Sequence, residues 1–380
     1  MQNNTLSRSE LDTAGKVLNI HYGDVLIKYG SVLDASDQTI PYIVPGNESP
    51  NYVHLQDGDV VIADTAEDET VGKTTEIYNV LGSKIEAGLH TIPCRPIIPF
   101  APKYLGYYMN TPCYHKQLIP LMQGIKVLSV SKGNISKTEI SAPNSLEEQE
   151  KISSLLYLLD QRAAIQSKII EALKKYKRGV TAKLIAAIEG KYPVVKLGDH
   201  VTVMRGGSPR PIDAYITNAE NGIRWIKIGD ALPDQLYISD TKEKIKPEGA
   251  KKSRRVYAGD LILSNSMSFG RPYILKVDGC IHDGWLLIRD EEKKFDKRFL
   301  CFYLASDITL AQYKKYAAGS CVNNLNSELV ASVKIGMPPI EQQIRMANIL
   351  EKIDRQVEAS GAMYSLLNKL RNALLQQLFT

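Results

Sequence analysis

LEEQEKISSLLYLLDQRAAIQSKIIEALKKYKRGVTAKL, residues 146–184, is repeated 194 positions later as IEQQIRMANILEKIDRQVEASGAMYSLLNKLRNALLQQL, residues 340–378. The two segments align without a gap, so that Gln149 corresponds to Gln343 and Asp160 to Asp354. Self-similarity on this scale is the sequence signature of a duplicated architecture. We therefore expect two similar halves, each of which ends in the same element.

Both copies have the periodicity of a long amphipathic helix. At alternating steps of four and three residues, eight of ten positions are apolar in each copy. The polar exceptions fall at matching places, with Lys177 corresponding to Arg371. Two unrelated core helices would not share these exceptions, and the spacing is typical of a coiled-coil seam. The residues expected to form this seam and a partner-binding surface are Leu156, Leu159, Ile170, Leu173, Leu350, Ile353, Leu367 and Leu374.

Shorter motifs repeat in the same order before each helix. GDVVIA at 58–63 resembles GDLILS at 259–264, and KYLGYYM at 103–109 resembles RFLCFYL at 298–304. The first pair, rich in β-branched residues and bounded by turn residues, predicts strands, and the second pair predicts short helices. Residues 15–24, which contain His21, also read as strand, with a structural role for this histidine.

These observations predict an α/β (α+β) fold in which two similar globules alternate with two long helices. The expected segments are a first globule (1–145), a central helix (146–190), a second globule (191–338) and a C-terminal helix (339–380). The second globule opens with VVKLGDHVTVMRGGSPRP, but the first retains a counterpart only to the end of this stretch. We therefore expect about fifteen residues, one strand, to be missing in front of Met1.

Composition excludes several classes of protein. Among the 380 residues, 44% are apolar and 23% are charged, but no run of 18 apolar residues that would span a membrane occurs. The N-terminus lacks the layout of a signal peptide. The five cysteines are scattered without C-x-x-C spacing, which argues against a disulfide framework or a zinc cluster and favours a cytoplasmic protein.

Charge is distributed unevenly along the chain. Residues 1–145 carry 11 basic and 15 acidic side chains, whereas residues 191–338 carry 23 and 17. A local positive excess favours a polyanionic partner for the second globule.

Five motifs, in order along this duplicated plan, carry a resemblance to a known family. They are IHYGD (20–24), DTAEDETVG (64–72), GDLILS (259–264) with Gly270, GSCVNNL (319–325) and PPIEQ (338–342). Together they resemble the specificity (S) subunits of type I restriction-modification systems. The sequence departs from that pattern in PNSL at 143–146, where the second copy has PPI, and in the acidic first globule.

The resemblance implies that each globule is a target-recognition domain and that the two helices pair antiparallel between them. It implies double-stranded DNA with a bipartite site as ligand, and two modification (methyltransferase) subunits and a restriction subunit as partners. S-adenosylmethionine, ATP and Mg would belong to those partners, with no cofactor in this chain.

Three expected loops of the second globule combine cationic groups, which suit phosphate, with polar groups that suit base edges. Their candidate DNA-binding residues are Arg205, Ser208, Arg210, Lys251, Lys252, Arg254, Arg255, Asn265, Ser266, Ser268 and Arg271. Arg271 is the candidate for reading a base. In the first globule the candidates are Arg8, Lys28, Lys73 and Thr74. The acidic loop at 64–74 could accept hydrogen bonds from cytosine amino groups or turn away from DNA.

Catalysis by this chain is not expected. The pair PD (233–234) and DTK (240–242) is too closely spaced for a nuclease metal site, no methyltransferase tetrapeptide occurs, and the six histidines form no metal-binding pair. An alternative to DNA recognition is a duplicated coiled-coil scaffold that binds proteins.

Overall fold

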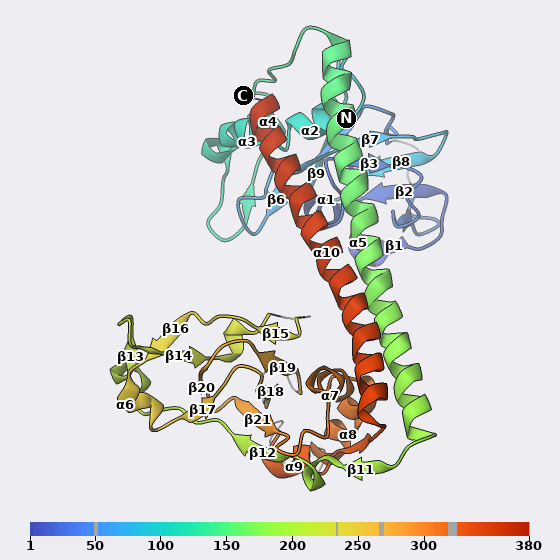
Figure 1. The fold of residues 1–380 in the computed structure, drawn as a ribbon. Helices are drawn as coiled ribbons and strands as arrows, with labels where there is room; N and C mark the ends of the chain where they lie inside the picture. Colours follow the sequence, from blue (N-terminus) through green and yellow to red (C-terminus); the bar gives the residue numbers. More distant parts are fainter. Residues whose placement is uncertain (49–51, 233–234, 266–269, 318–324, 380) are drawn as a thin grey trace. The chain divides into compact units, whose positions relative to one another are not determined.

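The computed structural model of the chain describes residues 1–48, 52–232, 235–265, 270–317 and 325–379. They form two compact units (Figure 1). Unit 1 comprises Met1–Ser167 and Met363–Thr380, and unit 2 comprises Lys168–Ala362. Both predicted long helices are present, as α5 (Leu146–Glu189) and α10 (Ile340–Leu378). Each helix contributes one part to each unit.

Unit 1 contains two four-stranded sheets and short helices. Across the first sheet the strands are β1 (Leu11–Asp12), β4 (Tyr42–Ile43), β2 (Val17–Ile20) and β8 (Lys84–Ala87); across the second they are β3 (Val32–Asp34), β7 (Thr74–Tyr78), β5 (Val60–Ala63) and β9 (Thr91–Cys94). β6 (Thr65–Ala66) pairs with β10 (Leu128–Ser129). The helices are α1 (Tyr22–Ile27), α2 (Tyr104–Tyr108), α3 (Pro112–Leu118) and α4 (Lys132–Ile135).

Unit 2 contains two five-stranded sheets, and in Figure 1 the sheet with β13 and β16 lies away from α7, α8 and α9. Across one sheet the strands are β12 (Thr202–Arg205), β21 (Trp285–Arg289), β18 (Leu261–Ser264), β19 (Pro272–Leu275) and β15 (Tyr237–Ile238); across the other they are β13 (Ile216–Thr217), β16 (Glu243–Ile245), β14 (Ile223–Ile226), β20 (Gly279–Ile281) and β17 (Arg254–Val256). β11 (Val194–Lys196) pairs with β22 (Lys334–Gly336). The helices are α6 (Pro247–Ala250), α7 (Lys297–Leu304), α8 (Asp307–Ala317) and α9 (Ser327–Ala331).

The strand order of unit 1 is contained within that of unit 2. The parallel pair β2–β8 corresponds to β14–β20, and the parallel pair β3–β7 corresponds to β15–β19. Each sheet of unit 2 has one additional strand at its end, β12 in one and β17 in the other. No strand takes these two positions in the described part of unit 1. The predicted internal repeat is therefore a repeat of the fold.

Local details of the repeated motifs also agree. Gly58 and Gly259 both have a positive φ, 86° and 89°, which glycine adopts without steric cost. The aspartate that follows each glycine accepts a hydrogen bond from a backbone N–H three residues earlier, at 2.8 Å for Asp59 and 2.9 Å for Asp260. The predicted short helices are confirmed as α2 and α7.

One local expectation was wrong. The stretch at 15–24 forms β2 but turns into α1 at its end, and His21 is the residue before that helix. Its Nδ1 accepts a hydrogen bond from the Gly23 N–H at 3.2 Å. The ring therefore caps the first turn of the helix, whose N–H groups have no partner within the helix.

The two helices run antiparallel within each unit, as the resemblance implied. In unit 1 the beginning of α5 packs against the end of α10, with Leu156 buried among Leu375 and Phe379. In unit 2 the end of α5 packs against the beginning of α10, with Ile185 buried beside Leu350. Of the predicted seam residues, Leu156, Leu350, Ile353 and Leu367 are buried, and Leu159, Ile170, Leu173 and Leu374 are partly buried.

Two of the polar exceptions in the seam, Lys177 and Arg371, form ion pairs between the helices. Arg371 pairs with Asp160 in unit 1, and Lys177 pairs with Asp354 in unit 2. Both pairs join equivalent positions of the repeat.

No described helix is long and apolar enough to cross a membrane.

Candidate nucleic-acid interface

Two of the three predicted DNA-binding segments of unit 2, at 205–210 and at Asn265, meet at Asp283, in the turn between β20 and β21. The main-chain carbonyl of Asp283 accepts hydrogen bonds from Arg205 Nε at 3.3 Å and from Asn265 Nδ2 at 2.9 Å. Its carboxylate accepts from Ser208 Oγ at 3.0 Å and lies 3.5 Å from an Arg210 guanidinium nitrogen. One residue therefore joins the end of β12, the loop after it and the end of β18.

The Asp283 carboxylate is held in its charged form by these partners. Partial burial raises its pKa, but the Ser208 hydrogen bond, the neighbouring His282 ring and the charges of Arg210 and Arg205 outweigh burial and lower it. His282 Nδ1 accepts from the Gly284 N–H at 2.9 Å, so the other ring nitrogen, 2.9 Å from the carboxylate, is the donor toward Asp283. Arg205 and Arg210 therefore both have a partner on Asp283, the main-chain carbonyl for one and the carboxylate for the other.

The predicted basic segment at 251–255 lies against the same loop. Arg254 Nε donates to the Arg205 carbonyl at 3.1 Å, and Lys252 Nζ donates to Tyr215 Oη at 2.6 Å. Lys251 and Arg255 are exposed, Arg255 within β17. The Arg254–Arg205 contact joins the two segments. Their cations are here called the basic cluster: Arg205, Arg210, Lys251, Lys252, Arg254 and Arg255.

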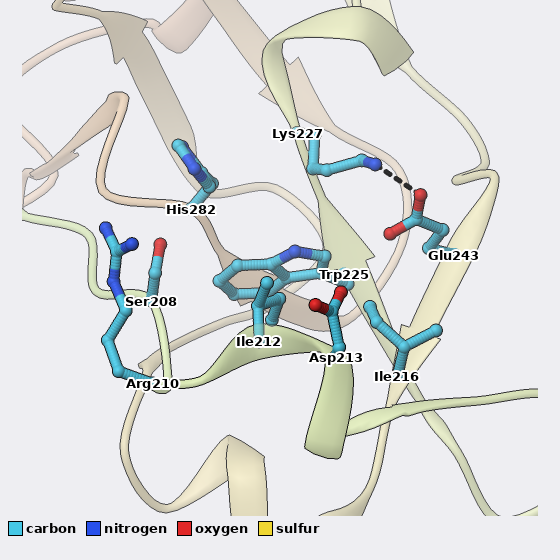
Figure 2. Close-up of a pocket in the computed structure, with 9 residues that line it drawn as sticks. All are labelled: Ser208, Arg210, Ile212, Asp213, Ile216, Trp225, Lys227, Glu243 and His282. Atoms are coloured by element: carbon cyan, nitrogen blue, oxygen red, sulfur yellow. Dashed lines mark hydrogen bonds and ion pairs between the residues drawn. The ribbon is translucent and has the colours of Figure 1, made fainter.

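A recess of about 580 Å³ lies beside the basic cluster (Figure 2). Ser208 and Arg210 line one side of it, and the ion pair of Lys227 with Glu243 lines another. The buried ring of Trp225 lies between them. Hydrogen-bond donors and acceptors therefore face one concavity, which is the chemistry that base edges require.

Other candidates of unit 2 are not part of this cluster. Arg271 is exposed at the beginning of β19 and lines a separate groove beside α5. Asn265 is only 4% exposed and its side-chain amide bonds to Asp283, so its assignment as a base-reading residue is corrected: it positions the loop. Ser266 and Ser268 lie outside the described residues, as do residues 319–324 of the GSCVNNL motif.

The candidates of unit 1 are not gathered in the same way. Arg8 forms two hydrogen bonds with the Asp24 carboxylate, at 2.7 and 3.0 Å, which raise the pKa of its guanidinium. Lys28 donates to the Thr39 carbonyl. A cation already paired with a carboxylate gains less from phosphate, because the pair must first be broken.

Two further candidates lie inside unit 1. Thr74 is fully buried in β7 and its hydroxyl donates to the Gly72 carbonyl at 3.0 Å, so its assignment as a DNA contact was wrong. Lys73 Nζ donates to the Leu26 carbonyl at 2.6 Å, and burial lowers the pKa of this ammonium group. Thr74 begins β7, an interior strand of its sheet whose first four residues are all buried.

The acidic loop of unit 1 exposes three consecutive carboxylates, at residues 67–69. Asp68 accepts hydrogen bonds from the backbone and side chain of Thr70, which lower its pKa. Exposure is compatible with both roles expected for this loop, contact with cytosine amino groups or orientation away from DNA.

Sequence reasoning did not identify Asp283, His282 or Tyr215. The Asp283-Gly284 dipeptide is a turn signal between two apolar runs. That signal indicates a turn, but it does not show that four side chains distant in sequence converge on it.

The chain is similar in sequence to known proteins along most of its length. The family model described as "Type I restriction modification DNA specificity domain" matches residues 189–367. The putative type I restriction enzyme MjaX specificity subunit of Methanocaldococcus jannaschii is 25% identical over 349 residues, covering 85% of this chain and 78% of that protein. The type I restriction enzyme StySPI specificity subunit of Salmonella potsdam is 22% identical over 342 residues, covering 83% and 72%.

Solved structures share the fold. The S subunit of a type I restriction-modification system from M. genitalium superposes with a TM-score of 0.61 at 12% identity, covering all of this chain and 93% of that one. A chain from a structure of type I restriction-modification complex assembly gives a TM-score of 0.54 at 20% identity, covering 92% and 90%.

Proposed function

We propose, from the membership of this chain in the family of type I restriction-modification specificity subunits, that it binds a bipartite double-stranded DNA site through its two globules. The family implies recognition of a DNA sequence. The observation that supports a bipartite site is the duplicated fold, in which each half repeats the same strand pairs and the same helix. Two similar readers in one chain suit two half-sites, as the two subunits of dimeric DNA-binding proteins do.

In unit 2 we assign different tasks to the two sides of the basic cluster. Arg205, Arg254 and Arg255 extend from end strands of the two sheets and suit phosphate, which gives affinity without sequence information. Ser208 and Arg210 line the recess and suit base edges. Asp283 fixes both groups relative to one another.

Partner subunits have a candidate surface on the helices. On α5 large apolar residues are exposed outside the seam, as they are on α10. They include Leu155, Leu158, Ile165, Ile169 and Tyr176 on α5, and Ile349, Met363, Leu366 and Leu370 on α10. Apolar stripes of this kind mark protein interaction sites. We assign them to the modification subunits, with the restriction subunit joining that assembly.

In this reading the chain contributes recognition and assembly, and the partners contribute catalysis. S-adenosylmethionine would be bound by the modification subunits, and ATP and Mg by the restriction subunit. Purified chain free of partners should not transfer methyl groups to DNA or cleave it, and either activity would contradict the assignment.

The decisive experiment is methylome sequencing of cells with and without this gene. We expect one bipartite motif to lose methylation when the gene is deleted and to regain it on complementation. A continuous motif would contradict the two-reader part of the proposal, and an unchanged methylome would contradict DNA recognition.

The alternative, a protein-binding scaffold, makes a different prediction for the assembled complex. Retention of double-stranded DNA should fall steeply with salt if cations bind phosphates. Retention of partner proteins without any DNA binding would favour the scaffold.

A further inference from the structure

The part of α5 that belongs to unit 2 is strongly basic. Residues 168–183 contain six Lys and Arg side chains and a single carboxylate, Glu171. The equivalent stretch of the repeat, residues 362–377 of α10, contains two basic side chains and no carboxylate. The positive charge is therefore not required by the coiled coil, since the other copy of the helix lacks most of it.

These residues occupy different faces of α5. The seam face carries Leu173 and Lys177, and the exposed apolar face carries Ile169 and Tyr176. Lys174 and Arg178, four residues apart, lie one above the other on a third face. Neither the seam nor the apolar stripe accounts for this cationic face.

The cationic face borders a groove of about 710 Å³ within unit 2. From α5 the groove is lined by Lys174, Lys177 and Arg178, and from the globule by Arg271. Its carboxylates are Glu171, Asp307 and Asp354.

The cations of the groove differ in their surroundings. Lys177 is engaged by Asp354 at 2.5 Å and lies 5.1 Å from the centre of the Phe302 ring, so this pair is part of the helix packing. Arg178 and Arg271 are exposed. The groove thus presents guanidinium groups from two separate elements, whose donors match phosphate oxygens.

We propose that this groove binds the phosphate backbone of DNA beside the half-site recognised by unit 2, which makes α5 a DNA-binding element as well as a spacer. This inference rests on the proposed function. Arg271 connects the groove to DNA recognition, because it is the last residue of the predicted recognition loop at 265–271 and also lines the groove. A phosphate contact adds affinity at every sequence and leaves the choice of bases unchanged.

The test compares two variants in the complex with the modification subunits. Arg178→Gln removes one exposed cation from the groove, where the repeat carries Asn372 at the equivalent helix position. Arg162→Gln removes one exposed cation of α5 that does not line the groove. The slope of log affinity against log salt should become shallower by about one for the groove variant and stay the same for the control.

DNA chemistry gives an independent readout. Methylphosphonate linkages outside the half-site should weaken binding of the unsubstituted protein and have no further effect on the groove variant. Equal slopes for both variants would overturn the inference, as would altered base preference. Loss of partner assembly with an unchanged slope would identify the groove as a protein-binding site instead. If the unsubstituted complex binds no DNA, the proposed function fails and this inference with it.

Discussion

At the scale of residues, Asp283 is an acidic residue that orients the polar and cationic groups of the basic cluster. It accepts hydrogen bonds from Ser208 and Asn265 and lies beside Arg210, so it orients groups that would otherwise be mobile. Hydrogen bonds to charged groups are stronger than those between neutral groups. The same charge repels phosphate, so Asp283 lowers overall affinity for DNA while it fixes the geometry that distinguishes sequences.

Asp283→Asn should therefore separate affinity from specificity. Without the negative charge, binding to unrelated DNA should strengthen several-fold, and the ratio of specific to unrelated affinity should fall because Arg210 loses its partner. Competition binding with specific and unrelated duplexes measures both quantities. Asp278→Asn, an exposed aspartate on the loop before β20, is the matched control and should leave the ratio unchanged.

Glu76 predicts a pH dependence of stability in unit 1. The side chain is 2% exposed and accepts a hydrogen bond from the Gly106 N–H at 2.9 Å. Burial raises its pKa to about 7, and hydrogen bonds from Gly106 and Lys103 oppose that rise. Because the folded state holds the proton more tightly than the unfolded state, the stability that this group adds is complete below about pH 4.5 and is lost as pH rises through 7.

Urea unfolding between pH 5 and 8 checks this expectation. The free energy of unfolding should fall by up to about 3 kcal/mol across the range through Glu76. Glu76→Gln should abolish that part of the dependence. A variant that keeps the full dependence would assign it to another group.

At the scale of elements, the two long helices combine a periodic apolar seam with one ion pair between them in each unit. Asp160 with Arg371 and Asp354 with Lys177 are equivalent pairs in the two units. In unit 1, Tyr107 Oη also donates to Asp160 at 2.9 Å. Because an unpaired charge in a seam is costly, these pairs favour one register of the helices over others.

Breaking one pair should destabilise its own unit. Asp160→Asn leaves Arg371 without its partner, and we expect a loss of about 1–3 kcal/mol. The double variant with Arg371→Gln should recover part of that loss. If the single and double variants were equally destabilised, the ion pair would contribute nothing to the helix contact.

Helix length should set the spacing of the two half-sites. Insertion of seven residues between Ile152 and Leu184, with a matching insertion in α10, preserves the seam and adds about 10 Å of helix. The spacer should then lengthen by about three base pairs, with the bases of both half-sites unchanged. Binding-site selection gives spacer and bases together, and rewritten half-sites would contradict the role of α5 as a spacer.

At the scale of the whole molecule, the two units share a topology but differ in their end strands. The additional strands of unit 2, β12 and β17, carry Arg205, Arg254 and Arg255. Unit 1 lacks both among its described residues and has fewer cations than carboxylates in residues 1–145. The two units thus share one strand arrangement. They differ in the strands at the sheet ends and in the positive charge that those strands carry.

This difference predicts modular specificity. Arg254→Ala with Arg255→Ala should weaken binding and flatten its salt dependence by about two, with the loss confined to the half-site of unit 2. Separate binding tests with each half-site mutated distinguish the two contributions. Equal damage at both half-sites would contradict independent recognition.

The sequence alone determined the duplicated plan, the two long helices and the positions of two short helices, α2 and α7, because heptad spacing and the repeat can be recognised without knowledge of contacts. It also located the cationic segments at 205–210 and 251–255. Only the tertiary structure decided which candidates act together, since β12 pairs with β21 and β17 pairs with β20 across large separations in sequence. Those pairings bring Asp283 to the arginines. In unit 1, Thr74 lies opposite Ile62 in the pairing of β7 with β5 and is buried there. Side-chain direction in a sheet depends on its partners, and no local pattern specifies them.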